Sequence, residues 1–249
     1  MSDNKSFSRA ASTYDLNACV QKASACELIS LLLSEDPESI LEPGCGTGLF
    51  TRLLSERFPR ALITAFDHSK EMVDSAKSRI TSNEITFFVD EAESFKSGKY
   101  DMIISNAAFH WFLNFRDVIE QQNKMLNPSG KIAFSYYGPQ TYRELRESLS
   151  ELTSKTEILS SDKFLKKTEI KAILETNFKK CIVHENIFFQ KFSSVFDLLK
   201  NIKLTGTNRK TGAQRIAWTK KLLESLDKIY KEKYGEIIAS YQVFYFIAS

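Results

Sequence analysis

Four residues at the end of an apolar segment have the spacing of a ligand-binding turn. The segment ILEPGCGTGLF, residues 40–50, reads Glu-x-Gly-x-Gly-x-Gly and contains Glu42, Gly44, Gly46 and Gly48. Glycines at this spacing let bare backbone approach a ligand, and the turn after the first strand of an open α/β sheet lies where such sheets bind ligands. A tight strand-to-helix turn without a ligand is the alternative interpretation.

Two known glycine-rich patterns do not fit this turn. The dinucleotide fingerprint needs glycine at its first, third and sixth positions, and the sixth position counted from Gly44 is Leu49. The P-loop ends in Gly-Lys-Ser/Thr, and no such sequence follows here. The turn therefore favours neither a dinucleotide nor a P-loop nucleotide.

Acidic residues follow the next two apolar strands. Asp67 lies nineteen positions after the last glycine of the turn, where a carboxylate can accept hydrogen bonds from both hydroxyls of a ribose. A helix-capping aspartate is the alternative. The segment VDEAESF offers Asp90 or Glu91 to an adenine amino group, and Met72 either covers the adenine ring or packs in the core. We include His68 among the candidates for cofactor binding.

Strand and helix patterns alternate along residues 14–138. Apolar runs predict five strands, and amphipathic runs predict four helices. The predicted strands are 40–43, 61–67, 85–90, 100–109 and 131–138, and the predicted helices are 14–35, 49–58, 69–80 and 115–126. The segment NPSG, residues 127–130, is predicted to form a turn. This alternation is typical of a doubly wound, mostly parallel sheet with helices on both faces.

The pattern changes after Gly138. Long segments rich in Lys and Glu, about 140–177 and 194–234, flank the apolar run 181–192, and the chain ends on a second apolar run, 240–249. We expect two late strands that bring the same sheet to seven strands. The expected organisation is one domain over 1–249, with an N-terminal helical segment (1–35) over the active site and a helical cap (139–180 and 193–236) inserted after the fifth strand.

The composition excludes several classes of protein. Hydrophobic residues make up 43% and charged residues 26% of the 249 residues, as in a globular domain and unlike a disordered chain. No apolar run reaches the roughly 18 residues that a membrane helix needs. Residues 1–12 have no hydrophobic targeting core, and the four cysteines have no paired metal-ligand spacing. We therefore expect a cytoplasmic protein with reduced thiols, no bound metal and no membrane partner.

The net charge of +3 is unevenly distributed. Residues 1–150 contain 16 Lys+Arg and 20 Asp+Glu, whereas residues 151–249 contain 18 and 11. The basic half is either a solvated helical surface or a docking face for an acidic partner. No compact Arg/Lys run with interleaved aromatic residues is present, so we expect no nucleic-acid partner.

Together the turn and the acidic residues resemble the class I S-adenosylmethionine-dependent methyltransferases, whose first motif is close to LEPGCGTG. The resemblance covers residues 40–138 and implies their doubly wound fold. It also implies that the glycine turn holds the methionine end of S-adenosylmethionine, that Asp67 holds the ribose, and that Asp90 or Glu91 holds the adenine.

The N-terminus resembles the malonyl-acyl-carrier-protein O-methyltransferases of biotin synthesis. That family opens with a similar arrangement, carried here by Phe7, Ala10, Ala11, Tyr14, Ala18 and Gln21. The similarity continues through SNAAFHW (105–111), which contains the candidate Asn106, through 133–148, and more weakly through 198–209 and 241–248. His110 stands where the family usually has glutamine.

This resemblance implies methyl transfer to the free carboxylate of a malonyl thioester, an early step towards the pimeloyl chain of biotin. A carboxylic acid with a pKa of about 4 is already ionised at neutral pH, so no strong general base is needed. The desolvated acceptor carboxylate still needs donors. The candidate acceptor-site residues are Tyr14, His110, Tyr136, Tyr137 and Arg143.

An acyl-carrier protein is acidic, so the basic residues of the second half could attract and dock it. The candidate docking residues are Lys163, Lys166, Lys167 and Lys171. Three alternatives stay open at this point: a methyltransferase of a free small acid such as trans-aconitate, a non-catalytic assembly factor that binds S-adenosylmethionine, and a C-methylating enzyme of a quinone pathway.

Overall fold

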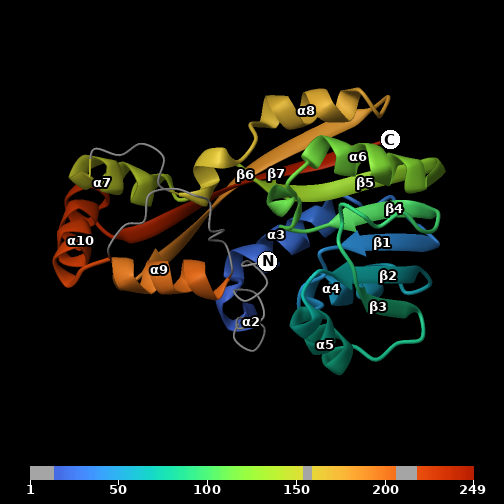
Figure 1. Ribbon diagram of the computed structural model, residues 1–249, viewed down its shortest axis with the longest axis horizontal. Coiled ribbons are helices and arrows are strands. Elements are labelled where there is room, and N and C mark those ends of the chain that lie inside the picture. Colours follow the sequence, from blue (N-terminus) through green and yellow to red (C-terminus); the bar gives the residue numbers. More distant parts are fainter. Residues whose placement is uncertain (1–13, 154–158, 206–217) are drawn as a thin grey trace.

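The computed structural model describes residues 14–153, 159–205 and 218–249. Its centre is a seven-stranded sheet in the order β3-β2-β1-β4-β5-β7-β6 (Figure 1). The strands are β1 Ser39–Pro43, β2 Leu62–Asp67, β3 Ile85–Val89, β4 Tyr100–Ser105, β5 Leu126–Tyr137, β6 Cys181–Phe192 and β7 Ile237–Ala248. Neighbouring strands from β1 to β5 pair in parallel, and β7 pairs antiparallel with both β5 and β6. The predicted mostly parallel, doubly wound sheet is confirmed.

Two layers of helices cover the sheet. The helices are α2 Tyr14–Asn17, α3 Cys19–Ser30, α4 Leu49–Arg57, α5 Lys70–Arg79, α6 Phe115–Met125, α7 Arg143–Thr153, α8 Lys167–Glu175, α9 Val195–Leu204 and α10 Lys220–Tyr234, with short 3-10 helices η1 Phe109–Trp111 and η2 Ser160–Lys163. Successive residues of a strand point to opposite faces, so Ile40 packs with the layer of α3, α4 and α5, and Leu41 with the layer of α6 and α8. A buried core therefore lies on each face.

The glycine turn lies at the switch point of the sheet. From β1 the chain continues to β2 and β3 on one side, and β4 and β5 lie on the other side. The loops after β1 and β4 therefore diverge at the carboxyl ends of adjacent strands, which is where open α/β sheets bind ligands.

Three sequence-based boundaries are wrong. The predicted helix 14–35 is broken at Ala18, and its two parts are α2 and α3. The predicted strand 100–109 ends at Ser105, because Ala107 has a positive φ of 53° that no strand accommodates. The predicted turn at residues 127–130 is part of β5, which begins at Leu126 and has an irregular register with β4 near Tyr100.

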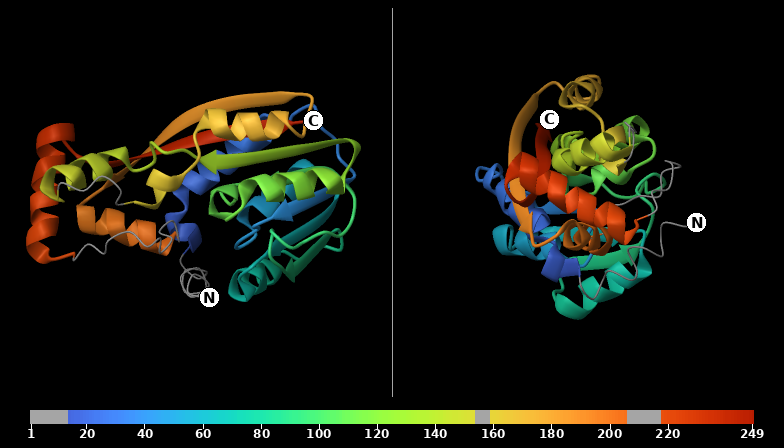
Figure 2. Two further views of the ribbon diagram at one scale, coloured as in Figure 1. Left: turned by 45° about the horizontal axis from the view of Figure 1, so that its top comes forward. Right: turned by 90° about the vertical axis from the view of Figure 1, so that its left-hand side faces the viewer.

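The last two strands extend well beyond the rest of the sheet. All twelve residues of β6 pair with β7, but β5 pairs with β7 only from Val243 to Ala248. The remaining half of this pair, Ile237–Gln242 with Ile187–Phe192, forms a two-stranded ribbon that projects past β5. The helices α7, α9 and α10 gather around this ribbon at one end of the molecule (Figure 2), and we call them the cap helices.

Helix α8 lies apart from the cap helices. Its buried residues Ile170 and Leu174 pack beside α6 over the main sheet. The expected cap segment 139–180 is therefore divided, with α7 at the ribbon and α8 in the layer that covers the sheet. None of the helices in the described ranges is long and apolar enough to cross a membrane.

A buried carboxylate joins α7 to the ribbon. Glu144 is 0% exposed, and its side chain accepts hydrogen bonds from the Ser240 backbone N–H at 2.9 Å and from the Ser240 hydroxyl. The Arg143 guanidinium lies 3.0 Å from the same carboxylate. Loss of this group would leave buried donors without an acceptor.

We therefore predict that Glu144→Ala lowers the free energy of unfolding by about 2–3 kcal/mol, measured by urea denaturation. The matched control is Glu151→Ala on the same helix, because the ion pair of Glu151 with Lys233 is exposed. That control should cost less than about 1 kcal/mol. Equal losses in the two variants would contradict the anchoring role of Glu144.

Candidate active site

The glycine turn is fixed by backbone hydrogen bonds to β2. The Gly44 and Cys45 N–H groups both donate to the Phe66 carbonyl, at 2.8 and 3.0 Å. Gly44 and Gly46 have φ values of 75° and 54°, in the left-handed region that glycine enters without steric cost. The turn therefore needs glycine for its backbone conformation as well as for close approach.

The glycines differ in what a side chain would meet. A Cβ at Gly44 would lie 2.5 Å from the Ala108 Cβ, and a Cβ at Gly48 would lie 2.9 Å from the Ile80 Cδ1. A Cβ at Gly46 would meet no heavy atom within 4 Å. Gly44 and Gly48 are thus required for packing, whereas Gly46 borders open space on the side where the cofactor is expected.

Asp67 connects this turn to helix α5. Its Oδ2 accepts the Gly46 N–H at 3.0 Å, and its Oδ1 accepts the Ser69 N–H at 2.9 Å. The His68 Nδ1 lies 3.3 Å from the same Oδ1. Burial raises the pKa of this carboxyl group, which is 8% exposed. The N-cap of α5 is Ser69, whose hydroxyl accepts the Met72 N–H at 3.3 Å, so helix capping does not account for Asp67.

Glu42 brings a carboxyl group to the same edge of the sheet. It is 1% exposed, and its Oε2 has no hydrogen-bond partner among the residues that the structure describes. Burial raises its pKa to about 8, the neighbouring Thr51 hydroxyl lowers that pKa in part, and the negative charge of Asp67 raises it further. A buried carboxyl oxygen without a described partner, at the end of the strand that leads into the glycine turn, fits a ligand that brings a hydrogen-bond donor or a positive charge, as the methionine end of S-adenosylmethionine does.

The candidate adenine-binding residues come after β2 and β3. Val89, the last residue of β3, pairs with Asp67, so Asp90 comes next at the same edge. The Asp90 N–H donates to the Asp67 carbonyl at 3.2 Å; Asp90 is half-buried and Glu91 is exposed. Met72 is 2% exposed in the first turn of α5.

The N-terminal helices are tied to this edge. The Thr47 hydroxyl in the glycine turn donates to Asp15 Oδ1 of α2 at 2.7 Å, and Asp15 also pairs with Arg79 of α5. The neighbouring Tyr14 has a pKa raised first by burial and then by the charges of Asp15 and Asp67. Sequence reasoning missed Asp15 and Thr47, because no motif marks a contact between residues so far apart in the chain. Phe7, Ala10 and Ala11 lie outside the described residues.

Asn106 holds helix α3 against the sheet. Its amide donates to the Gln21 carbonyl at 3.0 Å, and its carbonyl oxygen accepts the hydroxyls of Ser24 and Ser135 at 2.9 and 2.7 Å. Its side chain is therefore used within the protein, at a position between the N-terminal helices and the loop that follows β4.

His110 lies inside a set of aromatic rings. Its ring centroid is 4.6 Å from that of Trp111, 5.8 Å from Tyr136, 4.7 Å from Tyr137 and 5.0 Å from Phe164. We call His110, Trp111, Tyr136, Tyr137 and Phe164 the aromatic cage. Sequence reasoning missed Phe164, which reaches the cage from the segment before α8, because no local pattern predicts that contact.

Two polar groups of the aromatic cage have no hydrogen-bond partner within the described ranges. One is the imidazole of His110, which is 7% exposed and lacks a partner at both ring nitrogens. The other is the hydroxyl of Tyr137, which is 1% exposed. Burial lowers the pKa of His110 to about 3, so its imidazole is neutral near pH 7. A buried polar group without a partner costs about 1–3 kcal/mol, which a bound ligand can offset.

The other acceptor-site candidates differ in their surroundings. The Tyr136 hydroxyl accepts the Leu165 N–H at 3.2 Å, and burial raises its pKa to about 12. Tyr14 lies near Tyr137, since its charge contributes to the raised pKa of that residue. Arg143 pairs with Glu144 beside the ribbon and makes no described contact with the aromatic cage.

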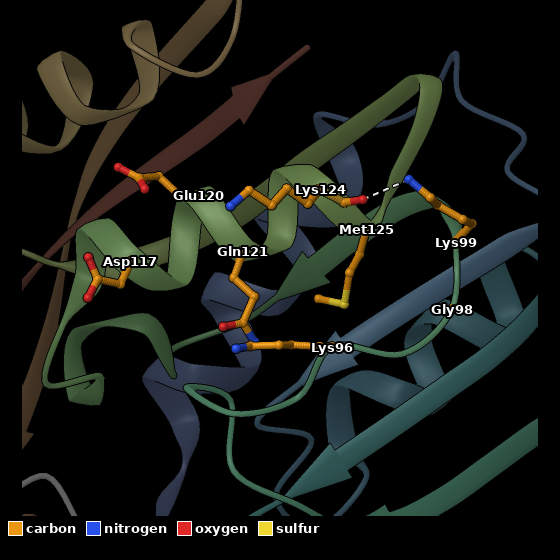
Figure 3. A pocket seen from close by; sticks show the side chains of 8 residues that line it. All are labelled: Lys96, Gly98, Lys99, Asp117, Glu120, Gln121, Lys124 and Met125. Atoms are coloured by element: carbon orange, nitrogen blue, oxygen red, sulfur yellow. Dashed lines mark hydrogen bonds between the residues drawn. The ribbon is translucent and has the colours of Figure 1, made fainter.

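A separate pocket of about 430 Å³ lies at the opposite edge of the sheet. It is lined by Lys96, Gly98, Lys99, Asp117, Glu120, Gln121, Lys124 and Met125, and Lys99 donates to the Lys124 carbonyl at 2.7 Å (Figure 3). These residues precede β4 or belong to α6, so the pocket is distant from the carboxyl ends of the strands.

Residues 41–134 match the family described as a methyltransferase domain. The chain is 40% identical to malonyl-[acyl-carrier protein] O-methyltransferase 1 of Ilyobacter polytropus, over 94% of this chain and 87% of that protein. It is 32% identical to malonyl-[acyl-carrier protein] O-methyltransferase of Priestia megaterium, over 93% and 91%.

Solved structures share the fold at low sequence identity. YcgJ protein from Bacillus subtilis has a TM-score of 0.60 at 17% identity, with 89% of this chain and 97% of that chain covered. The plantazolicin methyltransferase BpumL, in complex with SAH, has a TM-score of 0.51 at 19% identity, with 100% and 86% covered.

We predict that Glu42 makes the stability of the protein depend on pH. Its folded pKa of about 8 exceeds the value of about 4.3 for an unfolded glutamate, so between these values the folded protein binds more protons. Stability should therefore fall as pH rises from about 5 to about 8, and Glu42→Gln should remove that loss. We expect the variant to gain about 3–4 kcal/mol relative to the wild type over this interval, measured by urea denaturation.

The control for this prediction is Glu56→Gln, which removes an exposed carboxyl group of α4. It should leave the pH dependence of stability as in the wild type. Parallel pH profiles for Glu42→Gln and the wild type would show that Glu42 does not bind the additional proton.

Proposed function

The chain belongs to the malonyl-[acyl-carrier protein] O-methyltransferase family, and on that premise we propose that it transfers a methyl group from S-adenosylmethionine to the free carboxylate of malonyl-acyl-carrier protein. The observation that carries the proposal is the set of buried polar groups without described partners at one edge of the sheet. Glu42 supplies one on the cofactor side, and His110 and Tyr137 supply two on the acceptor side. The edge thus provides groups for two ligands.

In this proposal, different residues near the glycine turn bind different parts of the cofactor. Glu42 and the backbone at Gly46 bind the methionine end, and the free lone pairs of Asp67 accept the ribose hydroxyls beside His68. Met72 packs against the adenine, and Asp90, half-buried at the end of β3, takes its amino group in preference to the exposed Glu91. Gly44 and Gly48 shape the turn.

The cofactor supplies a methyl group whose carbon–sulfur bond breaks, with the electron pair left on sulfur, as the carboxylate oxygen forms its bond to that carbon. No proton moves, because the acceptor is already ionised. The protein's contribution is to align the carboxylate and to exclude water, and the aromatic cage provides both a wall and donors. The ester product is uncharged at that end, so enzymes of fatty-acid elongation can extend it towards the pimeloyl chain of biotin.

Lys163 and Lys166 lie close in sequence to Phe164 of the aromatic cage. Phe164 contacts His110, and Lys163 and Lys166 are exposed on either side of it, with no ion pair to another described residue. Lys167 and Lys171 pair with Glu185 and Glu175. An acidic carrier protein that docks at Lys163 and Lys166 would bring its tethered malonyl group to the cage.

A reducing compartment suits the surface thiols. Cys19 and Cys26 are exposed and form no disulfide. Exposed free thiols persist in the cytoplasm, where we place the reaction.

The test of the function is methyl transfer from labelled S-adenosylmethionine to malonyl-acyl-carrier protein, malonyl-coenzyme A and trans-aconitate in parallel. We expect strong preference for the carrier-bound malonyl group. Turnover of trans-aconitate alone would replace this function with methylation of a free acid, and absence of transfer to any acceptor would overturn it.

The space beside Gly46 gives a prediction on cofactor binding. Gly46→Ala places a methyl group in that space, so we expect S-adenosylhomocysteine to bind at least about tenfold more weakly by calorimetry, a loss of about 1.4 kcal/mol. The matched control is Gly235→Ala at the end of α10, where φ is 76° and no atom lies within 4 Å of the added Cβ. Both variants pay a similar backbone cost, so unchanged binding in Gly46→Ala would place the cofactor elsewhere.

Reversal of charge at the proposed docking site should weaken the encounter with the carrier. For Lys163→Glu with Lys166→Glu we expect KM for malonyl-acyl-carrier protein to rise about tenfold at low salt and to lose its salt dependence, with kcat nearly unchanged. Lys179→Glu with Lys180→Glu changes the net charge equally at the far end of α8 and should have little effect. Equal KM values for the two double variants would remove the docking site.

A further inference from the structure

The aromatic cage offers hydrogen-bond donors but no positive charge. The four rings that contact His110 belong to Trp111, Tyr136, Tyr137 and Phe164, none of which carries a charge near pH 7. Burial is the cause of the lowered pKa of His110. The groups that act on the Tyr137 hydroxyl are tyrosines, namely Tyr14, Tyr142 and Tyr245. The described groups around both residues are therefore uncharged near pH 7.

The arginine that the sequence suggested as a counter-ion is engaged elsewhere. Arg143 lies 3.0 Å from the carboxylate of Glu144, which is itself anchored to Ser240 of the ribbon. Among the described residues, a carboxylate that enters the cage would find neutral donors. A buried charge without a partner is strongly unfavourable, so a positive charge on a second ligand in the site would stabilise it.

We propose that the acceptor carboxylate is held by two neutral donors, the His110 imidazole N–H and the Tyr137 hydroxyl, and that its counter-charge is the sulfonium of the methyl donor. This inference rests on the proposed function and specifies how the same site recognises its acceptor. His110 and Tyr137 are adjacent, with ring centroids 4.7 Å apart, and their polar atoms have no other partner among the described residues.

Neutral donors suit this reaction better than a guanidinium would. A guanidinium bound to the carboxylate would compensate its charge and reduce its reactivity towards the methyl group. Neutral donors orient the carboxylate and leave its charge to attract the sulfonium, an attraction that a buried site strengthens. When the methyl group has moved, the ester and the thioether are both uncharged, so the attraction between the two ligands is lost and the products separate.

The inference predicts that acceptor affinity depends on the charge of the bound cofactor. The experiment measures binding of malonyl- and acetyl-acyl-carrier protein to the full chain by calorimetry, with saturating sinefungin or saturating S-adenosylhomocysteine. Sinefungin carries an ammonium group where the methyl donor has its sulfonium, whereas S-adenosylhomocysteine is neutral there. We expect the malonyl carrier to bind about tenfold more tightly with sinefungin, and the acetyl carrier to bind equally with both.

Variants test the two donors by the same measurement. His110→Phe and Tyr137→Phe keep aromatic rings in the cage and should each weaken binding of the malonyl carrier about tenfold without effect on the acetyl carrier. His110→Gln keeps an N–H donor and should restore most of the affinity. The matched controls are His184→Gln, an exposed histidine of β6, and Tyr230→Phe, a buried tyrosine of α10 whose hydroxyl also has no described partner.

The outcomes separate this inference from the proposed function. If the malonyl carrier is methylated but binds equally with the two cofactor analogues, or if His110→Phe and Tyr137→Phe both bind it as the wild type does, the inference is overturned and the function stands. If the wild type binds neither loaded carrier and does not methylate the malonyl carrier, both are overturned.

Discussion

The bidentate use of the Asp67 carboxylate is the interaction on which the site depends. One oxygen accepts the Gly46 N–H of the turn after β1, and the other accepts the Ser69 N–H at the start of α5. The turn after β1 is thereby joined to the junction of β2 and α5 around one buried carboxyl group. Because glycine enters left-handed conformations without steric cost, hydrogen bonds must hold the shape of the turn, and the carboxylate adds to those accepted by the Phe66 carbonyl.

Buried polar groups without a described partner lower the stability of the protein at the same edge of the sheet. Glu42, His110 and Tyr137 all have buried polar atoms without a described partner, whereas most buried polar groups in folded proteins are satisfied. Their distribution is uneven. The carboxyl group of Glu42 lies at the end of β1, before the glycine turn, and the imidazole and hydroxyl groups lie in the aromatic cage, so the two halves of the site offer different polar groups to their ligands.

The sequence predicted the parts of this arrangement that depend on local pattern. The strands 40–43 and 85–90 agree with β1 and β3 within one residue, because apolar residues between turn residues determine them. The predicted strand 100–109 was too long, because its apolar run continues past the point where Ala107 turns the backbone. Contacts such as Asp15 with Thr47 and His110 with Phe164 join residues that no local pattern relates, so only the folded chain reveals them.

The continuity of β7 determines how the site can admit its ligands. This strand runs for twelve residues from the ribbon into the main sheet, where Val243 pairs with Tyr137 of the aromatic cage. Its hydrogen bonds to β6 continue along its whole length. The ribbon that carries the cap helices and the strand that borders the aromatic cage are therefore parts of one hydrogen-bonded ladder, which opposes a hinge between the cap and the sheet.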